Sequence, residues 1–325
     1  MNLGVDFTDP GLESEVRSGL LSVEGLLRDT VKSDYPFVTE TSLHLVDAGG
    51  KRFRPLLVLL AAHFGDAGAP GVLPAAVVVE LTHLATLYHD DVMDDAPMRR
   101  GAVSANNKWG NSIAILTGDF LFAKASQLLA DLGPECVRIQ ARTFERLVHG
   151  QIRETAGPEP SVDPVEDHLR VLADKTGSLI GTCGRFGAML SGADEGVTET
   201  LCRFGEKIGV AFQLSDDLLD VASDAGQSGK APGTDLRAGV RTLPVLYALA
   251  SGDEFVVTAL SRDLGSDDAL AAALDALRAH PAMAQARTVL HGWADSARAE
   301  LAGLPENAAR RALEALCDAV VARTA

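Results

Sequence analysis

The sequence predicts an all-α protein. Apolar residues make up 46% of its 325 residues, which is enough to form a large buried core. Aromatic residues account for 5%, and Ala, Leu and Val dominate, a composition that suits helices better than a sandwich of β-strands. Glycines and prolines interrupt the chain at intervals that separate helical segments of roughly 15 to 25 residues.

The chain has no repeat of fixed period, no low-complexity segment and no long linker, so we expect a single domain covering residues 1–325. Two segments, 74–95 and 199–224, are apolar nearly all round, which is typical of helices surrounded by other helices. We expect them at the centre of a bundle. The last sixty or so residues are amphipathic and Ala-rich, which predicts outer helices that complete the fold.

The formal net charge of −16 excludes nonspecific attraction to nucleic acid or to an anionic membrane surface. The four cysteines are widely spaced and lack the spacing of a zinc site, so we expect a reducing compartment. Residues 1–15 are acidic and polar, unlike a signal peptide. The most apolar stretch, 72–88, contains proline, glutamate and histidine, which favours a buried core helix over a membrane span. A cytoplasmic location follows as an expectation.

Two clusters of aspartates share the pattern Asp-Asp-x-x-Asp. They are Asp90, Asp91 and Asp94, and then Asp216, Asp217 and Asp220. On a helix, residues i and i+4 lie on one face one turn apart, so each cluster presents a pair of carboxylates. Mg²⁺ prefers oxygen ligands and is commonly held by a few carboxylates together with substrate phosphates. The two clusters therefore predict a magnesium site for a diphosphate.

Acidic runs are more often solvated helix faces, and that alternative fits an isolated cluster better. Here both clusters lie toward the C-terminal end of a strongly apolar helix. The helix dipole disfavours carboxylates at that end, and like charges at i and i+4 repel each other. This arrangement costs stability unless cations offset it, which favours metal binding.

Basic residues cluster at two places near the first aspartates. Lys51 and Arg54 lie upstream, and Arg99 and Arg100 lie just downstream. Arginine grips phosphate oxygens with two parallel hydrogen bonds and lysine supplies a point charge, so these groups suit two diphosphates. Taken singly, each is more typical of a surface charge.

Three weaker candidates accompany these basic groups. His83 precedes Asp90 by two helical turns and faces the same way, although a lone histidine in an apolar helix is usually a core residue. Lys175, followed by Thr176, and Lys230 each stand near glycine in predicted loops or helix ends, where they could reach a phosphate.

Taken together, these residues resemble the trans-isoprenyl diphosphate synthases, or polyprenyl synthetases, from about residue 45 to 250. The motifs that carry the resemblance are Gly49-Gly50-Lys51-Arg52-Phe53-Arg54-Pro55, Glu80-Leu81-Thr82-His83, His89-Asp90-Asp91-Val92-Met93-Asp94, Arg99-Arg100-Gly101, Gly118-Asp119-Phe120, Lys175-Thr176, Gln213-Leu214-Ser215-Asp216-Asp217-Leu218-Leu219-Asp220, Gly229-Lys230, Gly233-Thr234-Asp235-Leu236 and Thr242-Leu243-Pro244.

The resemblance implies an isoprenoid-synthase helical bundle around a deep central cavity, usually in a homodimer, with the two aspartate clusters facing each other across its mouth. It implies that Asp90, Asp91, Asp94, Asp216, Asp217 and Asp220 hold magnesium and the allylic diphosphate, with three ions when substrate is bound. Arg99, Lys175, Thr176, Gln213 and Lys230 are implied to bind that allylic substrate. Lys51, Arg54, His83 and Arg100 are implied to bind isopentenyl diphosphate. The catalytic set comprises the six aspartates with Lys175 and Lys230.

One position departs from the family's pattern. The family often has a lysine in the Gly-Lys that precedes Thr-Leu-Pro, whereas this chain has Val240 there, followed by Arg241. On a helix Arg241 would point about 100° away, so it is left out of the predicted site.

The implied reaction is repeated condensation of an allylic diphosphate with isopentenyl diphosphate to a linear all-trans polyprenyl diphosphate. A class I terpene cyclase would also ionise an allylic diphosphate, but it has less need of a second group of basic residues. A noncatalytic partner subunit of a heteromeric synthase is a further alternative, although such subunits tend to lose the aspartate motifs. No membrane span is expected, and the product would be released at a membrane surface.

Product length is predicted from Ala85 and Thr86. In the family, enzymes with short products often place bulky aromatics four or five residues before the first aspartate. Ala85 lies about 7.5 Å from Asp90 along the helix axis, where a small side chain leaves the channel open and predicts a long product of about C30 to C50. A geranylgeranyl or farnesyl diphosphate synthase is the alternative. Tyr88 points about 200° away from Asp90, which predicts packing against a neighbouring helix.

Overall fold

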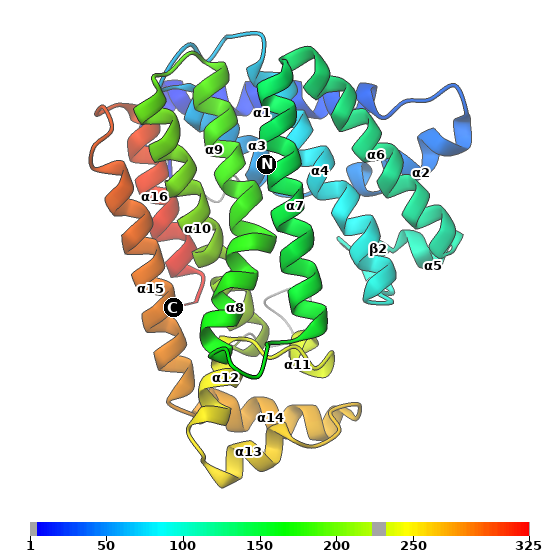
Figure 1. Cartoon of the computed structure of the whole chain (residues 1–325), viewed down its shortest axis with the longest axis vertical. Helices are drawn as coiled ribbons and strands as arrows, with labels where there is room; N and C mark the ends of the chain where they lie inside the picture. Colours follow the sequence, from blue (N-terminus) through cyan, green and yellow to red (C-terminus); the bar gives the residue numbers. More distant parts are fainter. Residues whose placement is uncertain (1–4, 223–231, 325) are drawn as a thin grey trace. The chain divides into compact units, whose positions relative to one another are not determined.

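The structure is a computed structural model that describes residues 5–222 and 232–324. Its helices, in chain order (Figure 1), are α1 (Pro10–Thr30), α2 (Pro36–Asp47), α3 (Phe53–Ala62), α4 (Val72–Met93), α5 (Ala105–Trp109), α6 (Asn111–Leu132), α7 (Pro134–Ala156), α8 (Pro164–Leu172), the π-helical turn η1 (Ala173–Gly177), α9 (Ser178–Leu190), α10 (Glu195–Ala222), α11 (Thr234–Arg237), α12 (Leu243–Ala250), α13 (Glu254–Leu260), α14 (Asp267–Ala279), α15 (Ala282–Leu301) and α16 (Ala308–Ala322).

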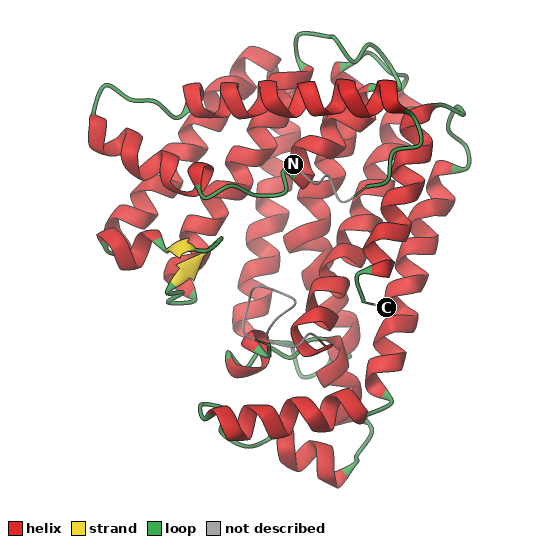
Figure 2. Ribbon diagram, turned by 180° about the vertical axis from the view of Figure 1, so that it is seen from behind, coloured by secondary structure: helices red, strands yellow, loops and turns green. Residues whose placement is uncertain are grey.

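The all-α prediction is confirmed. Helices dominate the described residues, and the strands found among them, β1 (Met98–Arg99) and β2 (Ala102–Val103), form one short antiparallel hairpin (Figure 2). The sequence did not predict this hairpin, because two residues per strand leave no alternation of polar and apolar residues to detect.

Local sequence signals set several helix ends. Asp9 accepts a hydrogen bond from Leu12 N at 2.9 Å, and Pro10 follows as the first helical residue of α1. Asp163 caps α8 in the same way ahead of Pro164. A carboxylate cap and an N-terminal proline are both favourable here, because the first amide groups of a helix lack backbone acceptors.

The chain divides into two compact units. The first contains Met1–Thr143, Thr182–Cys202 and Leu304–Leu313. The second contains Phe144–Gly181, Arg203–Gly303 and Glu314–Ala325. The first aspartate cluster belongs to the first unit, and the second cluster belongs to the second unit.

Helix α4 is the core helix of the first unit. It packs against α1, α3, α5 and α6, and most of its residues between Val72 and Asp91 are buried. Tyr88 is fully buried, donates a hydrogen bond to Thr41 O at 2.5 Å and accepts one from Leu45 N at 3.3 Å. The predictions of a central helix over 74–95 and of a packing role for Tyr88 are confirmed.

Among the described residues, two helices, α4 and α6, are long and apolar enough to cross a membrane by length and composition alone. The apolar window of α4 is 67% buried, as expected for a core helix, whereas that of α6 is only 33% buried. Leu116 on α6 is 62% exposed. Helix α6 therefore presents apolar side chains that the described residues do not cover.

Glycines bring the helices of the second unit close together. A Cβ on Gly205 of α10 would lie 2.5 Å from Ile180 O, and one on Gly209 would lie 2.9 Å from Gly177 Cα. Helices α12, α13, α14 and α15 pack against one another in the same unit. The buried residues of α15 recur on one helical face, for example Ala286, Leu290 and Ala294, which confirms the amphipathic pattern predicted for the C-terminal region.

We predict that Gly187→Ala destabilises the protein. A Cβ at Gly187 of α9 would lie 2.3 Å from Val58 O of α3, so the two helices would have to separate. Overpacking of this kind costs roughly 1 to 3 kcal/mol in the free energy of unfolding, measurable by urea denaturation. The matched control is Gly25→Ala in α1, where no atom lies within 4 Å of the new methyl group. That change should be neutral or stabilising by up to about 1 kcal/mol, and equal effects of the two substitutions would contradict the packing argument.

Candidate active site

The first aspartate cluster lies at the C-terminal end of α4, as predicted. The helix ends at Met93, and Asp94 caps it with its amide 2.8 Å from Asp90 O. Asp90 is partly exposed, Asp91 is fully buried and Asp94 is exposed. Carboxylates at this end face the negative pole of the helix dipole, so the cluster is electrostatically unfavourable without cations.

The hairpin after α4 brings two arginines back toward that helix. Arg99 pairs with Ala102 across the hairpin, which leaves Arg100 and Gly101 as a two-residue turn with φ values of +53° and +78°. Two residues with positive φ are what a type I′ turn requires, and this conformation is unfavourable for an arginine. Arg99 Nε donates to Asp91 Oδ1 at 2.6 Å.

Asp91 has one oxygen in use and one without a partner. Its Oδ1 accepts from Arg99, while its buried Oδ2 has no hydrogen-bond partner. Burial raises the pKa of Asp91, and the charge of Arg99 opposes that rise. A buried carboxylate oxygen without a partner is costly, and it suits a hard cation that prefers oxygen ligands.

Four arginines lie close enough to affect the pKa of His83, a residue predicted for the site. Burial lowers the pKa of His83 well below its ordinary value, and the charges of Arg54, Arg100, Arg99 and Arg52 lower it further. His83 is therefore neutral at pH 7. The first unit thus brings together the predicted residues Arg54, His83, Arg99 and Arg100, while Lys51 lies in the exposed loop before α3.

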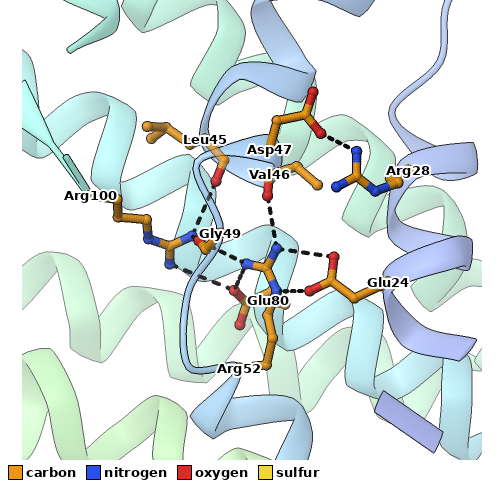
Figure 3. A network of polar contacts seen from close by, with 9 residues as sticks. All are labelled: Glu24, Arg28, Leu45, Val46, Asp47, Gly49, Arg52, Glu80 and Arg100. Atoms are coloured by element: carbon orange, nitrogen blue, oxygen red, sulfur yellow. Dashed lines mark hydrogen bonds and ion pairs between the residues drawn. The ribbon is translucent and has the colours of Figure 1, made fainter. Parts of the chain in front are cut away.

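Arg52 and Glu80 were missed by the sequence analysis as residues of this site. Arg52 Nη1 donates to Glu80 Oε1 at 2.8 Å, and Arg52 also pairs with Glu24 of α1 (Figure 3). Arg52 and Glu80 are each only 2% exposed. A glutamate in the most apolar segment of the chain was the available signal, because a buried carboxylate needs a charged partner.

The second cluster lies near the end of α10, where three predicted residues form a chain of hydrogen bonds. Thr176 Oγ1 donates to Gln213 Oε1 at 3.3 Å, and Gln213 Nε2 donates to Asp217 Oδ1 at 3.1 Å. The buried Asp217 Oδ2 has no hydrogen-bond partner, although His168 Nε2 lies 3.3 Å away without the alignment of a hydrogen bond. His168 of α8 was not predicted, and its sequence context gives no signal for it.

Asp220 receives backbone donors from the segment at the start of α11. The amides of Thr234 and Asp235 donate to its two side-chain oxygens at 3.0 and 3.1 Å. Asp220 is therefore fixed by the backbone that follows the second cluster along the chain.

Lys175 lies in the π-helical turn η1, where the sequence predicted a loop or helix end. Helical structure continues through this point, and α7 packs closely against it: a Cβ on Gly150 would lie 2.7 Å from Lys175 N. Lys175 Nζ donates to Glu154 Oε2 of α7 at 2.6 Å, and both side chains are 30% exposed. Glu154 was not predicted, and a diphosphate would compete with it for Lys175.

Arg323 contacts the second cluster from the C-terminal end of the chain. It donates to Asp216 Oδ1 at 2.5 Å and lies over the ring of Phe212, 4.8 Å from its centroid. Its buried Nη1 has no hydrogen-bond partner. The sequence predicted only outer helices for the C-terminal residues. This contact adds a role that no local pattern could indicate, because it joins residues 107 positions apart.

Lys230 lies outside the described residues, and Arg241, at the departure from the family pattern, is exposed.

Within residues 5–222 and 232–324, no three His, Cys, Asp or Glu side chains are grouped closely enough to hold a metal ion by themselves. A cation at either cluster would therefore need ligands from water or from a substrate, as Mg²⁺ commonly does.

A family model matches most of this chain. The model described as polyprenyl synthetase matches residues 35–277, which is more than half of the chain. The chain belongs to the polyprenyl synthetase family, and the resemblance found in its sequence is confirmed.

Similar proteins extend this match over nearly the full length. The nonaprenyl diphosphate synthase of Mycobacterium tuberculosis is 51% identical over 98% of this chain and 97% of that protein. The crystal structure of a decaprenyl diphosphate synthase from Rhodobacter capsulatus has a TM-score of 0.88 at 34% identity and covers 97% of this chain and 98% of that one. A geranylgeranyl pyrophosphate synthase from Corynebacterium glutamicum, complexed with calcium and isoprenyl diphosphate, has a TM-score of 0.88 at 42% identity and covers 98% and 99%.

We predict that His83 stays neutral at and below pH 6.5, its ordinary pKa. Imidazole ¹⁵N NMR during a pH titration should show it charged only at lower pH. Arg54→Gln should raise its pKa, because Arg54 is the largest charged contribution to the lowering. Since the unfolded chain then binds the proton more readily, His83 should make folding less favourable as pH falls below about 6.5. Half-protonation of His83 at pH 6.5 or above would contradict the assignment.

Proposed function

We propose that this chain is a Mg²⁺-dependent prenyltransferase that adds isopentenyl diphosphate repeatedly to an allylic diphosphate, giving a linear all-trans polyprenyl diphosphate of about C30 to C50. The observation that carries the proposal is that the chain has both carboxylate clusters suited to a cation and a group of arginines suited to phosphates. Buried carboxylate oxygens without hydrogen-bond partners occur in both aspartate clusters, and a group of arginines surrounds a neutral histidine. Similarity to synthases named for nonaprenyl and decaprenyl diphosphate supports the long product.

The metal assignment rests on the donor set. Asp90, Asp91, Asp94, Asp216, Asp217 and Asp220 would hold magnesium, three ions with substrate bound. The proposal is supported by the unpartnered oxygens of Asp91 and Asp217 and by the calcium in the similar C. glutamicum synthase. Bound Mg²⁺ would supply positive charge that stabilises the departing diphosphate.

The basic and polar residues divide between the two substrates. Arg99, Lys175, Thr176, Gln213 and Lys230 would bind the allylic diphosphate. Lys51, Arg54, His83 and Arg100 would bind isopentenyl diphosphate. Because His83 is neutral, it can donate one hydrogen bond to a phosphate oxygen without adding charge.

The reaction needs no side-chain nucleophile. The C–O bond of the allylic diphosphate breaks, and the cationic side chains stabilise the negative charge that develops on the leaving group. The double bond of isopentenyl diphosphate then forms the new C–C bond, and a proton leaves from the adjacent carbon to the released diphosphate. The product is again an allylic diphosphate, so the cycle can repeat.

One alternative is that this chain is one component of a heteromeric synthase, and a specific observation favours it. A relative from Geobacillus stearothermophilus, 39% identical over 91% of this chain, is named heptaprenyl diphosphate synthase component 2. That name raises the alternative that this chain needs a second component. Activity of the purified chain alone would show that no second component is needed, and inactivity would favour the two-component alternative.

We also propose a homodimer in the cytoplasm, with the chain folding as a single domain and product passing to a membrane surface. The apolar side chains that α6 exposes, including Ile115 at 42% and Leu116 at 62%, support contact with a second copy. The four cysteines are free thiols, consistent with a reducing compartment.

The direct test is incubation of the purified chain with isopentenyl diphosphate, Mg²⁺ and allylic primers of several lengths, followed by mass spectrometry of the products. Linear products of about C30 to C50 are expected from the small side chain of Ala85. Consumption of the allylic substrate without isopentenyl diphosphate would indicate a cyclase instead.

We predict that Asp90→Ala or Asp216→Ala lowers turnover by about two or more orders of magnitude while the helical content, measured by circular dichroism, is unchanged. The matched control is Asp131→Ala, because Asp131 is an exposed aspartate near the C-terminal end of the apolar helix α6. It should retain full activity. Near-normal turnover of Asp90→Ala at saturating Mg²⁺ would rule out the metal assignment for the first cluster.

We predict that Ala85→Phe shortens the product. Ala85 is fully buried, and its carbonyl oxygen lies 3.1 Å from a Cβ built on Gly118 of α6, so the wall at this depth has little room to yield. A phenylalanine side chain at this position should disfavour intermediates longer than about C15 to C20, because overpacking by a longer isoprenoid tail costs about 1 to 3 kcal/mol. Thr86 is partly exposed, and Thr86→Phe provides the comparison. A wild-type enzyme that already stops at C20 or below would show that another residue limits the chain.

A further inference from the structure

The carboxylate of Glu80 lies between the guanidinium groups of two arginines (Figure 3). Its Oε1 is 2.8 Å from Arg52 Nη1 and 3.7 Å from Arg100 Nη2. Two like charges this close in a protein interior repel strongly unless a negative charge separates them. Glu80 supplies that charge.

Backbone carbonyls at the end of α2 complete the surroundings of both arginines. Arg52 Nη2 donates to Val46 O at 3.0 Å, and Arg100 Nη1 donates to Leu45 O at 3.2 Å and to Gly49 O. These carbonyls lie in or just beyond the last turn of the helix, where the dipole favours cations.

Gly50 leaves room for the guanidinium of Arg100. Its φ is +150°, and a Cβ at this position would lie 3.0 Å from both Cζ and Nη1 of Arg100. Arg100 therefore lies directly against the backbone of the loop that also carries Lys51.

The two arginines differ in what their positions allow. The side chain of Arg52 has no exposed surface, and Glu24 engages its Nε and Nη2 while Glu80 engages its Nη1. The side chain of Arg100 is 17% exposed. Arg52 is thus a fixed internal charge, whereas Arg100 retains access to a ligand.

We infer that Glu80 is a positioning residue for isopentenyl diphosphate. It holds Arg100 against the loop of Gly49 and Gly50, with Arg52 as its fixed counterpart. This inference rests on the proposed function, in which Arg100 binds that substrate. Glu80 does not touch the substrate itself, so its effect must pass through Arg100.

The test is Glu80→Gln, which keeps the shape of the side chain and removes its charge. The KM for isopentenyl diphosphate should rise at least about tenfold, because Arg52 and Arg100 then repel each other and Arg100 leaves its position. The KM for the allylic diphosphate should change by less than about threefold, since Arg99 is held separately by Asp91. Each KM is measured with the other substrate saturating.

The matched control is Asp47→Asn. Asp47 is the last residue of α2, the helix whose terminal carbonyls Arg52 and Arg100 contact, but it pairs with Arg28. Neither of these exposed residues touches Arg52 or Arg100 in Figure 3. Both KM values should equal those of the wild type. A rise with Asp47→Asn equal to that with Glu80→Gln would overturn the inference.

A double-mutant cycle separates positioning from general damage to the fold. In an Arg100→Ala background, Glu80→Gln should raise the KM for isopentenyl diphosphate little further, because the group it positions is gone. Full additivity of the two effects would overturn the inference.

If Glu80→Gln fails to fold, Gly50→Ala decides the question. It removes no group of the Arg52–Glu80 pair, and its methyl group would displace the guanidinium of Arg100 while straining the loop at Gly50, so the same selective rise in KM is expected. An unchanged KM would overturn the inference. A wild-type chain that does not consume isopentenyl diphosphate overturns the proposed function and this inference together, whereas an active wild type with an unaffected Glu80→Gln overturns the inference alone.

Discussion

Buried charge pairing in the first unit determines where a group of arginines can lie. The chain carries a net charge of −16, yet four arginines lie within electrostatic range of His83. Glu80, Glu24 and Asp91 form ion pairs with three of them, Arg52, Arg99 and Arg100. Without these carboxylates the arginines would repel one another and move toward solvent. The same carboxylates leave the group with only a small positive excess, which an anionic substrate can satisfy.

In the second unit, neutral groups hold two aspartates of the second cluster and an arginine pairs with the third. Asp217 receives a hydrogen bond from the Gln213 amide, and Asp220 receives two backbone amides. Asp216 is paired with Arg323, the third residue from the C-terminus. A cation that binds Oδ1 of Asp216 must therefore displace the guanidinium of Arg323.

The sequence predicted those features whose signal is local. Helical periodicity and apolar composition gave α4 and α10 to within a few residues, and i, i+4 spacing placed each aspartate cluster on a helix end. The packing of Tyr88 followed from its angle to Asp90. The contacts of Arg52, Glu154, His168 and Arg323 could not be predicted, because each partner lies on another element and leaves no trace in local spacing. The π-helical turn at Lys175 lies directly against glycines of α7 and α10 that are distant in sequence.

The two-residue turn at Arg100 and Gly101 has a consequence for how this enzyme family member can change. Neighbouring residues of a hairpin point in different directions, so adding or removing one residue would exchange the orientations of everything beyond it. Arg99 would then no longer meet Asp91, and Arg100 would no longer meet Glu80. The hairpin is therefore sensitive to length: its exposed Met98 and Val103 leave room for substitution, whereas a change of length in the hairpin would disturb the contacts that its two arginines make with buried carboxylates.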